Sequence, residues 1–188
     1  MTEILQLGDP RLREVSAPVA DVRNPAFMGA AERLRATLTA FHKTNGWGRA
    51  ISAPQIGVPQ RFIALDLPEW GGGPKLLINP QIVWSSSETF TMWDDCMSFA
   101  ALFVRVHRYR SISVEFEDEN GEPQHWFKLE PSISELLQHE IDHLDGILAI
   151  DRAIDRDSIV LREVFEAGRS YFEQQVDYVI PVRRAQSG

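Results

Sequence analysis

Apolar residues recur at helical spacing in two long segments of the chain. In the first segment, Asn24-Pro25 precedes a series of apolar positions, namely Phe27, Ala30, Ala31, Leu34, Leu38 and Phe41. Asparagine followed by proline is typical of the start of a helix, and the later pair Asn45-Gly46 is typical of a helix end. The pattern therefore predicts a helix between these two signals.

The second segment carries an apolar stripe formed by Ile133, Leu137, Ile141, Leu144 and Leu148. Ser132 and Glu135 have the spacing of a capping box, in which each side chain bonds the other residue's backbone at the start of a helix. Asp145-Gly146 supplies a natural end. A last helix is predicted over residues 157–175, with an apolar face of Leu161, Val164, Phe165, Tyr171 and Phe172.

Four shorter segments have the patterns of strands. Residues 61–67 and 75–83 are rich in isoleucine and leucine and are bounded by proline and glycine. Residues 111–116 alternate apolar and polar side chains, and the turn sequence at 118–121 separates them from residues 124–129, which predicts a hairpin. Because helices and strands are mixed without strand–helix–strand alternation, we predict an α+β fold.

Length, charge and cysteine content narrow the class of protein. The 188 residues are expected to form a single domain, residues 1–188, with a frayed tail at residues 182–188. A net charge of −8 argues against a DNA-binding or membrane-surface protein. The single cysteine excludes an intrachain disulfide. Since neither a signal peptide nor a run of 18 apolar residues is found, we expect a soluble, cytoplasmic protein with no membrane or DNA partner.

The predicted helix at 132–145 contains the pattern H-E-x-x-H. His139 and His143 are four residues apart, so their side chains project from one helix face about 40° apart, which lets both imidazoles bind one metal ion. Glu140 lies beside that ion, where a general base is needed. The histidines also face away from the apolar stripe, toward a cleft or an opposing strand. The alternative is a pair of ordinary surface histidines.

Two histidines do not complete a catalytic metal site, which usually has three protein ligands. The acidic residues downstream do not stand in a third-ligand pattern; they are Asp145, Asp151, Asp155 and Glu163. Upstream, Cys96 offers a thiolate, a good partner for two imidazoles. From the residues alone, a buried structural cysteine remains the alternative.

Residues 48–57 form a run of small residues that contains Gln55. A run of small residues lets a substrate backbone approach closely, and a glutamine amide can donate to a developing oxyanion. The alternative is a plain loop between a helix and a strand.

Together, these segments resemble the peptide deformylase family. The family's loop motif is matched at Gly48, Ile51, Ala53, Pro54 and Gln55; its Glu-Gly-Cys-Leu-Ser motif is matched at Cys96 and Ser98, with Met97 in place of leucine. Its Gln-His-Glu-x-Asp-His-Leu-x-Gly motif is matched in full at residues 138–146. The likeness extends to about Arg152. It implies a peptide-deformylase-like fold, in which mixed or antiparallel sheets surround the helix with the H-E-x-x-H motif and a C-terminal helix follows.

The resemblance also implies a metal-dependent hydrolase that releases formate from an N-terminal formyl-methionine. Cys96, His139 and His143 would hold one divalent metal ion, Fe(II) in the cell, with zinc, nickel or cobalt able to replace it. Glu140 would serve as general base toward metal-bound water and then as general acid. Gln55 and the backbone N–H of Met97 would stabilise the oxyanion. Asp142 would either tether a neighbouring group or form a helix salt bridge.

Contacts with the formylated peptide are expected from the same three motifs and the residues around them. The expected substrate-binding residues are Gly48, Ala50, Ile51, Asp95, Phe99, Phe103, Ser132, Glu135 and Leu136. A basic patch of Arg105, Arg108 and Arg110 would either touch a ribosome transiently or form a solvated strand face. The protein is expected to be a monomer or a homodimer.

Several positions depart from the family pattern, and all concern the substrate. Ala50 and Ser52 replace a glycine and an alanine of the loop motif, Asp94-Asp95 replaces Glu-Gly, and Phe103 replaces an arginine that contacts the peptide. Glu135 either completes the capping box or faces a pocket made for a side chain more polar than methionine. A deformylase-like amidase for another N-formyl or N-acyl substrate, a general metalloprotease and a metal-binding homologue without activity therefore remain alternatives.

Overall fold

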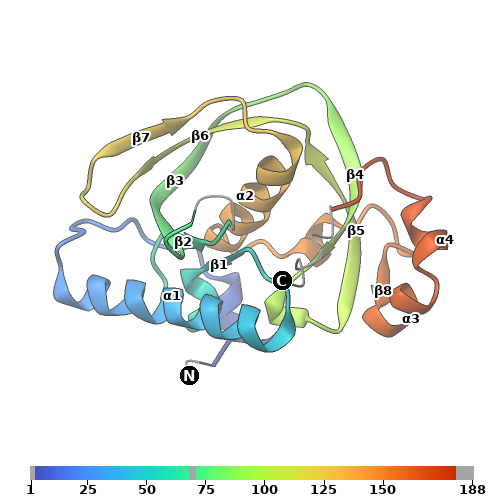
Figure 1. Ribbon diagram of the computed structural model, residues 1–188, viewed down its shortest axis with the longest axis horizontal. Coiled ribbons are helices and arrows are strands. Elements are labelled where there is room, and N and C mark those ends of the chain that lie inside the picture. Colours follow the sequence, from blue (N-terminus) through green and yellow to red (C-terminus); the bar gives the residue numbers. More distant parts are fainter. Residues whose placement is uncertain (1–2, 68–70, 181–188) are drawn as a thin grey trace.

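Two antiparallel sheets surround a central helix in the computed structural model, which describes residues 3–67 and 71–180 (Figure 1). One sheet has the strand order β1-β2-β3-β6-β7 and the other the order β4-β5-β8. The strands are β1 (Ala50–Ser52), β2 (Phe62–Leu65), β3 (Lys75–Ser85), β4 (Thr89–Asp95), β5 (Leu102–Tyr109), β6 (Ile112–Glu117), β7 (Pro123–Trp126) and β8 (Ile159–Leu161). The predicted α+β class is confirmed, whereas the predicted tail at 182–188 lies outside the described residues.

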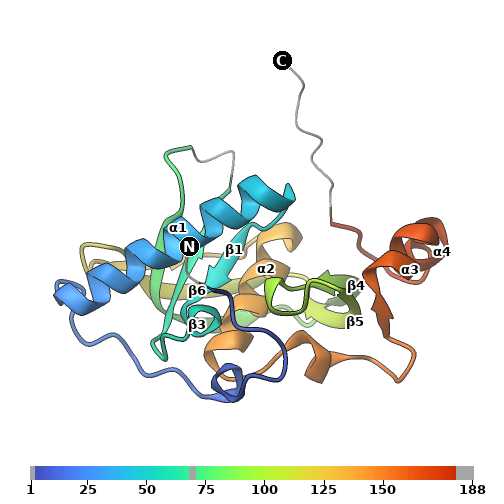
Figure 2. The same cartoon turned by 90° about the horizontal axis from the view of Figure 1, so that it is seen from below.

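The first helix, α1 (Pro25–Asn45), has the predicted ends. The Asn24 side chain accepts a hydrogen bond from the backbone of Ala26, and Gly46 closes the helix in the left-handed conformation at φ 74°. Its apolar side packs on one face of the five-stranded sheet, where Phe27 meets Phe62 edge to face at 5.1 Å. Figure 2 shows α1 running along this side of the molecule.

The central helix, α2 (Pro131–Leu144), covers the other face of the same sheet. Alternate side chains of β2 point to the two helices: Phe62 and Ala64 join the α1 core, and Ile63 and Leu65 join the α2 core. Because both faces of β2 are covered, the strand is buried throughout and its sequence is continuously apolar. This burial explains why residues 61–67 were recognisable as a strand.

The predicted capping box at the start of α2 is wrong. The N-cap residue is Glu130, and Pro131 occupies the first helical turn, where its fixed φ favours a helix start. Glu135 instead forms an ion pair with Arg49. The helix ends at Leu144, so Leu148 lies beyond it, in the core packed against the second sheet.

The hairpin predicted at 111–129 is confirmed as β6 and β7. Strand β4 was not predicted, and for β5 the only expectation was the alternative of a strand face around Arg105, Arg108 and Arg110. In the β4–β5 pair, Asp94 lies opposite Val104 and Asp95 opposite Phe103. Residue 96 directly follows β4, so the strand places it near the end of the central helix.

The single helix predicted at 157–175 is also wrong in its extent. Residues Ile159–Leu161 form β8 on the edge of β5, and the helical part is divided into α3 (Arg162–Ala167) and α4 (Arg169–Glu173). Gly168 separates the two helices, consistent with the low helix propensity of glycine. The chain then returns to β4, where the Tyr178 amide donates to the Thr91 carbonyl at 3.1 Å.

Within residues 3–67 and 71–180, no helix has the length and apolar character needed to cross a membrane.

Candidate metal centre

Cys96, His139 and His143 meet between β4 and α2. Their potential ligand atoms all lie within 4.8 Å of one another. The Cys96 sulfur lies 3.2 Å from Nε2 of His143. All three side chains are buried. A thiol and two imidazoles at this spacing form the three-ligand set expected from the sequence.

The three donors fit a borderline divalent metal ion such as iron or zinc. Nδ1 of His139 donates to the Asp94 carboxylate at 2.9 Å, and although burial alone would lower the pKa of His139, this carboxylate raises it, so a metal ion bound at Nε2 would displace a proton. Burial lowers the pKa of His143, so its imidazole is neutral and keeps a lone pair. Burial raises the pKa of the Cys96 thiol, so metal binding at neutral pH would release a proton from it.

A buried chain of charges holds His139 in place. Asp94 accepts from both His139 and Arg108, and Arg108 donates onward to Asp142 at 2.6 Å. Asp142 also binds Arg152, so it tethers neighbouring groups and does not join the three ligands. Burial alone would raise the pKa of Asp94, but His139 and Arg108 hold that pKa well below its usual value. Asp94 therefore stays ionised and orients the imidazole.

The interpretation of the three arginines as an accessible or solvated basic face is wrong for Arg108. Its side chain is 3% exposed because it bridges Asp94 and Asp142. Arg105 is partly buried and pairs with Asp155 at 2.8 Å, whereas Arg110 is exposed. A buried arginine bound to two carboxylates compensates their charge in the interior, which the strand pattern alone did not indicate.

Replacing Asp94 by asparagine is expected to weaken metal binding about 10–100-fold, because the neutral amide orients His139 less firmly. Asp94→Glu keeps the charge and is expected to recover most of the affinity. The affinity can be measured by competition with a chromogenic chelator. Asp157→Asn, which changes an exposed carboxylate, serves as the control. Equal affinity in Asp94→Asn and the unaltered chain would refute the orienting role of Asp94.

Glu140 lies beside the three ligands with its carboxylate held by a second element. The Ser52 hydroxyl donates to this carboxylate and also approaches the Glu140 backbone carbonyl at 3.1 Å. Burial raises the pKa of Glu140, which suits a group that accepts and later returns a proton. Ser52 was noted only as a departure from the family motif, yet it contacts the candidate general base.

The amide of Gln55 is fixed in one orientation. Its Oε1 accepts from the backbone N–H of Ser52 at 2.9 Å, so its Nε2 points the other way. There Nε2 donates to the Ser98 hydroxyl at 3.1 Å and lies 3.6 Å from the Cys96 sulfur. The donor expected to stabilise an oxyanion is thus next to the metal ligands.

Gly48 brings the loop motif against the cysteine motif. It has φ 103°, and a Cβ at this position would lie 2.5 Å from Cε of Met97 and 3.1 Å from the Phe41 ring. The left-handed conformation favours glycine, whereas the close contact is with the flexible end of the Met97 side chain. The loop and Met97 consequently line the same pocket.

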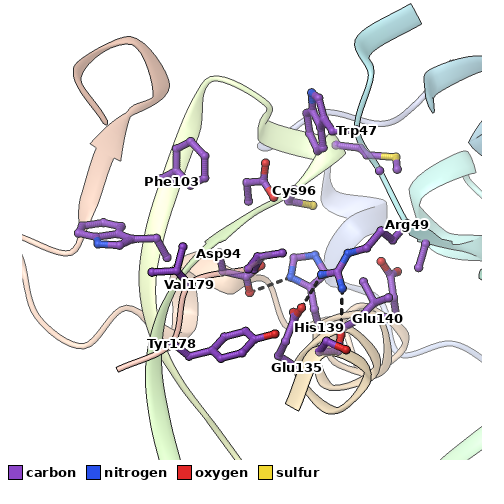
Figure 3. Close-up of a pocket in the computed structure, with 18 of the residues that line it drawn as sticks. Trp47, Arg49, Asp94, Cys96, Phe103, Glu135, His139, Glu140, Tyr178 and Val179 are labelled. Carbon is purple, nitrogen blue, oxygen red and sulfur yellow. Dashed lines mark hydrogen bonds and ion pairs between the residues drawn. The ribbon is translucent and has the colours of Figure 1, made fainter. Parts of the chain in front are cut away.

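A pocket of about 1220 Å³ opens beside Cys96 and His139 (Figure 3). Most of the expected substrate-binding residues line it: Gly48, Ala50, Asp95, Phe103, Ser132, Glu135 and Leu136. Ile51 and Phe99 lie instead in the hydrophobic core, Ile51 beneath α1 and Phe99 beside β4 and β5.

Several residues that line the pocket were not predicted from the sequence, among them Trp47, Arg49, Arg162 and Tyr178. Arg162 donates to Asp95 at 2.6 Å, and its guanidinium lies over the rings of Trp47 and Phe103, 4.7 and 4.4 Å from their centroids. Only the tertiary structure brings Arg162 and Tyr178 to the pocket. For Arg49, the sequence offers one signal of a place in the pocket, namely the glycine and aromatic residues next to it.

Comparison with known proteins agrees with the arrangement of these motifs. The family model described as Polypeptide deformylase matches residues 1–158. The chain is 34% identical to a peptide deformylase of Thermotoga neapolitana over 163 residues, covering 87% of this chain and 93% of that protein. It is 35% identical to peptide deformylase 2 of Xanthomonas campestris pv. campestris over 150 residues, covering 79% of this chain and 84% of that protein.

Solved structures give the same result. The crystal structure of the peptide deformylase from Thermotoga maritima has a TM-score of 0.71 and 32% identity, covering 82% of this chain and 99% of the other. That of a peptide deformylase from Synechococcus elongatus in complex with actinonin has a TM-score of 0.73 and 28% identity, covering 88% of this chain and 85% of the other.

Proposed function

The chain belongs to the polypeptide deformylase family, and from this premise we propose how its own residues remove a formyl group. The protein is a metal-dependent hydrolase that acts on the formyl amide at the N-terminus of newly made peptides. The observation that supports this function most strongly is the convergence of Cys96, His139 and His143, of which Cys96 and His139 line a pocket together with Glu140. A purely structural metal site would need neither the adjacent carboxylate nor the pocket.

Cys96, His139 and His143 hold the metal ion, and Fe(II) is the ion we propose for the cell. When bound, the ion supplies Lewis acidity that lowers the pKa of a neighbouring water molecule. Zinc, nickel or cobalt suit the same donors and are expected in purified protein. Because Cys96 must stay reduced to serve as a ligand, we place the enzyme in the cytoplasm.

Glu140 moves the protons of the reaction. Its carboxylate accepts the proton of the attacking water as the new bond to the formyl carbon forms. It then gives that proton to the amine nitrogen as the carbon–nitrogen bond breaks. The products are formate and a free amino terminus. Ser52 keeps the carboxylate pointed at the reacting atoms through its hydrogen bond.

Gln55 and Met97 stabilise the negative charge that develops on the formyl oxygen. The Gln55 amide is held by Ser52, so its Nε2 is already oriented before the substrate arrives. The backbone N–H of Met97, directly after Cys96, is the second proposed donor. Donors fixed in advance stabilise a transition state without reorganisation.

Gln55→Ala is expected to lower kcat about 10²–10³-fold, because removal of one oxyanion donor typically has this effect. Metal content should stay unchanged, since Gln55 is not one of the three ligands. Single-turnover kinetics and elemental analysis on the same preparation give both quantities. Gln60→Ala, a change on the neighbouring loop, is the matched control. A kcat equal to that of the unaltered chain would remove Gln55 from the mechanism.

An experiment with paired substrates separates this function from its alternatives. Nickel-loaded protein is incubated with two peptides that differ only in an N-terminal formyl or acetyl group. We expect release of formate without acetate and without cleavage of internal peptide bonds. Acetate release would favour a broader amidase, internal cleavage would favour a protease, and the absence of all three would favour a metal-binding homologue. A transient ribosome contact remains a proposal and would involve the exposed Arg110, because Arg108 is buried. The active unit is a monomer or a homodimer.

A further inference from the structure

Arg162 reaches the active-site pocket from a part of the chain that lies beyond the segment matched by the family model, residues 1–158. Strand β8 pairs with β5, and directly after β8 the backbone N–H of Arg162 donates to the Ala101 carbonyl at 2.7 Å. Nε of the side chain donates to the Ala100 carbonyl, and Nη2 donates to the Asp95 carboxylate, both at 2.6 Å. Backbone and side-chain contacts thus fix the position of the guanidinium.

Part of this guanidinium is available to a ligand. An arginine side chain has five N–H groups, and Arg162 uses those of Nε and Nη2 for Ala100 and Asp95. Within the part of the chain that the structure describes, Nη1 has no hydrogen-bond partner. The side chain is 26% exposed, and the rings of Trp47 and Phe103 pack against the guanidinium. Nη1 can therefore donate to an oxygen atom that enters the pocket.

The guanidinium joins the two segments between which the reacting end of the peptide must lie. In the proposed mechanism the formyl oxygen is held between Gln55, in the loop motif, and Met97, in the cysteine motif. Arg162 lies over the Trp47 ring, directly before the loop motif, and binds Asp95, directly before the metal-ligating cysteine. A peptide that runs between the two motifs therefore passes the guanidinium.

The guanidinium is also displaced from the metal ligands. Figure 3 shows Trp47 and Phe103 on one side of Cys96, and His139 with α2 on the other side. Since the guanidinium lies over both of these rings, it is on their side of the cysteine. A formyl group between Cys96 and His139 is thus separated from Arg162 by the cysteine. The guanidinium consequently meets a later part of the peptide.

This inference rests on the proposed deformylase function and adds a substrate-binding residue to it. We infer that Nη1 of Arg162 donates a hydrogen bond to a main-chain carbonyl of the formylated peptide beyond its first residue. A main-chain carbonyl is present in every peptide, so the contact is compatible with any sequence. Asp95 already balances the charge of Arg162, so a neutral oxygen suits the guanidinium and a substrate carboxylate is not needed. Arg162 takes no part in proton transfer.

The test compares N-formyl-methionine amides of one, two and three residues, with alanine at each added position. Nickel-loaded protein is assayed for kcat and KM with each amide. We expect kcat/KM of the unaltered chain to rise at least about tenfold from the shortest amide to the longest, because a hydrogen bond from a charged donor stabilises the complex by about this factor. Arg162→Met should lose this gain through a higher KM, with the shortest amide hydrolysed as before.

The outcomes distinguish this inference from the proposed function. An unaltered chain without the gain in kcat/KM, or an Arg162→Met variant that keeps it while all amides are hydrolysed more slowly, would overturn the inference and leave the deformylase function intact. No formate from any amide with the unaltered chain would instead refute the proposed function.

Two further variants separate peptide binding from a structural role of Arg162. Arg105→Met removes an arginine with the same kinds of contact, an ion pair with Asp155 and a position over the Trp93 ring, that does not line the pocket. It should keep the gain with peptide length. Should Arg162→Met fold poorly, Arg162→Lys keeps a cation for Asp95 but places its donors on one nitrogen, so none remains at the place of Nη1. It should lose the gain, and a full gain in Arg162→Lys would contradict the inference.

Discussion

Replacing Glu140 by glutamine is expected to lower kcat for formyl-peptide hydrolysis about 10²–10⁴-fold while the metal ion stays bound. Glutamine keeps the size of the side chain and its contact with Ser52, but it cannot accept the proton of the attacking water. The three ligands are unchanged, so the metal content measured by elemental analysis should equal that of the unaltered chain. The variant thus separates proton transfer from metal binding.

The measurement for Glu140→Gln is single-turnover formate release with metal-loaded protein. Glu115→Gln, which changes an exposed carboxylate on β6, provides the matched control and should leave kcat unchanged. Ser52→Ala offers a graded comparison, because it removes the hydrogen bond to Glu140 and leaves the carboxylate in place. Full activity of Glu140→Gln with bound metal would show that another group transfers the proton.

The second large effect is expected for Cys96→Ser. Serine is nearly isosteric, but its hydroxyl is a much weaker ligand than a thiolate for iron or zinc. Substitution of a residue that only orients a ligand typically weakens metal binding roughly 10–100-fold, which is the loss expected for Asp94→Asn. The loss of metal affinity in Cys96→Ser should be larger. Activity at limiting metal should fall with the occupancy.

Metal content after gel filtration and chelator competition test this expectation. Ser98→Ala, two residues further along the same turn, is the control, because its hydroxyl binds Gln55 and does not belong to the three ligands. Full metal occupancy in Cys96→Ser at equal chelator concentration would refute Cys96 as a ligand. Loss of metal in both variants would point to misfolding of the turn.

The predictable part of the fold rests on local patterns. The Asn24-Pro25 start and the Gly46 end of α1 act within a few residues, and a buried strand such as β2 is apolar throughout. The histidine pair could be predicted equally well, because a spacing of four residues on a helix fixes the relative position of the two side chains. Cys96 lies 47 residues before His143, so its residue type made it a candidate ligand, and the motif resemblance decided against a merely structural cysteine.

The incorrect predictions came from interactions between distant segments. Glu135 has a capping-box spacing, but Pro131 starts the helix earlier and Arg49 binds the carboxylate. Arg108 stands in a basic strand pattern, yet two aspartates from other elements make its burial favourable. The apolar spacing at 157–175 did not reveal that β8 would pair with the edge of β5.

The most direct test of a metal-dependent deformylase is stoichiometric product release before and after metal removal. Anaerobically prepared protein, loaded with Fe(II) or nickel, is incubated with a formylated peptide, and formate and free amine are both quantified. We expect equal amounts of the two products, loss of both after chelation, and recovery after reloading. Formate release that persists without metal, or no release from fully loaded protein with any formylated peptide, would contradict the proposed function.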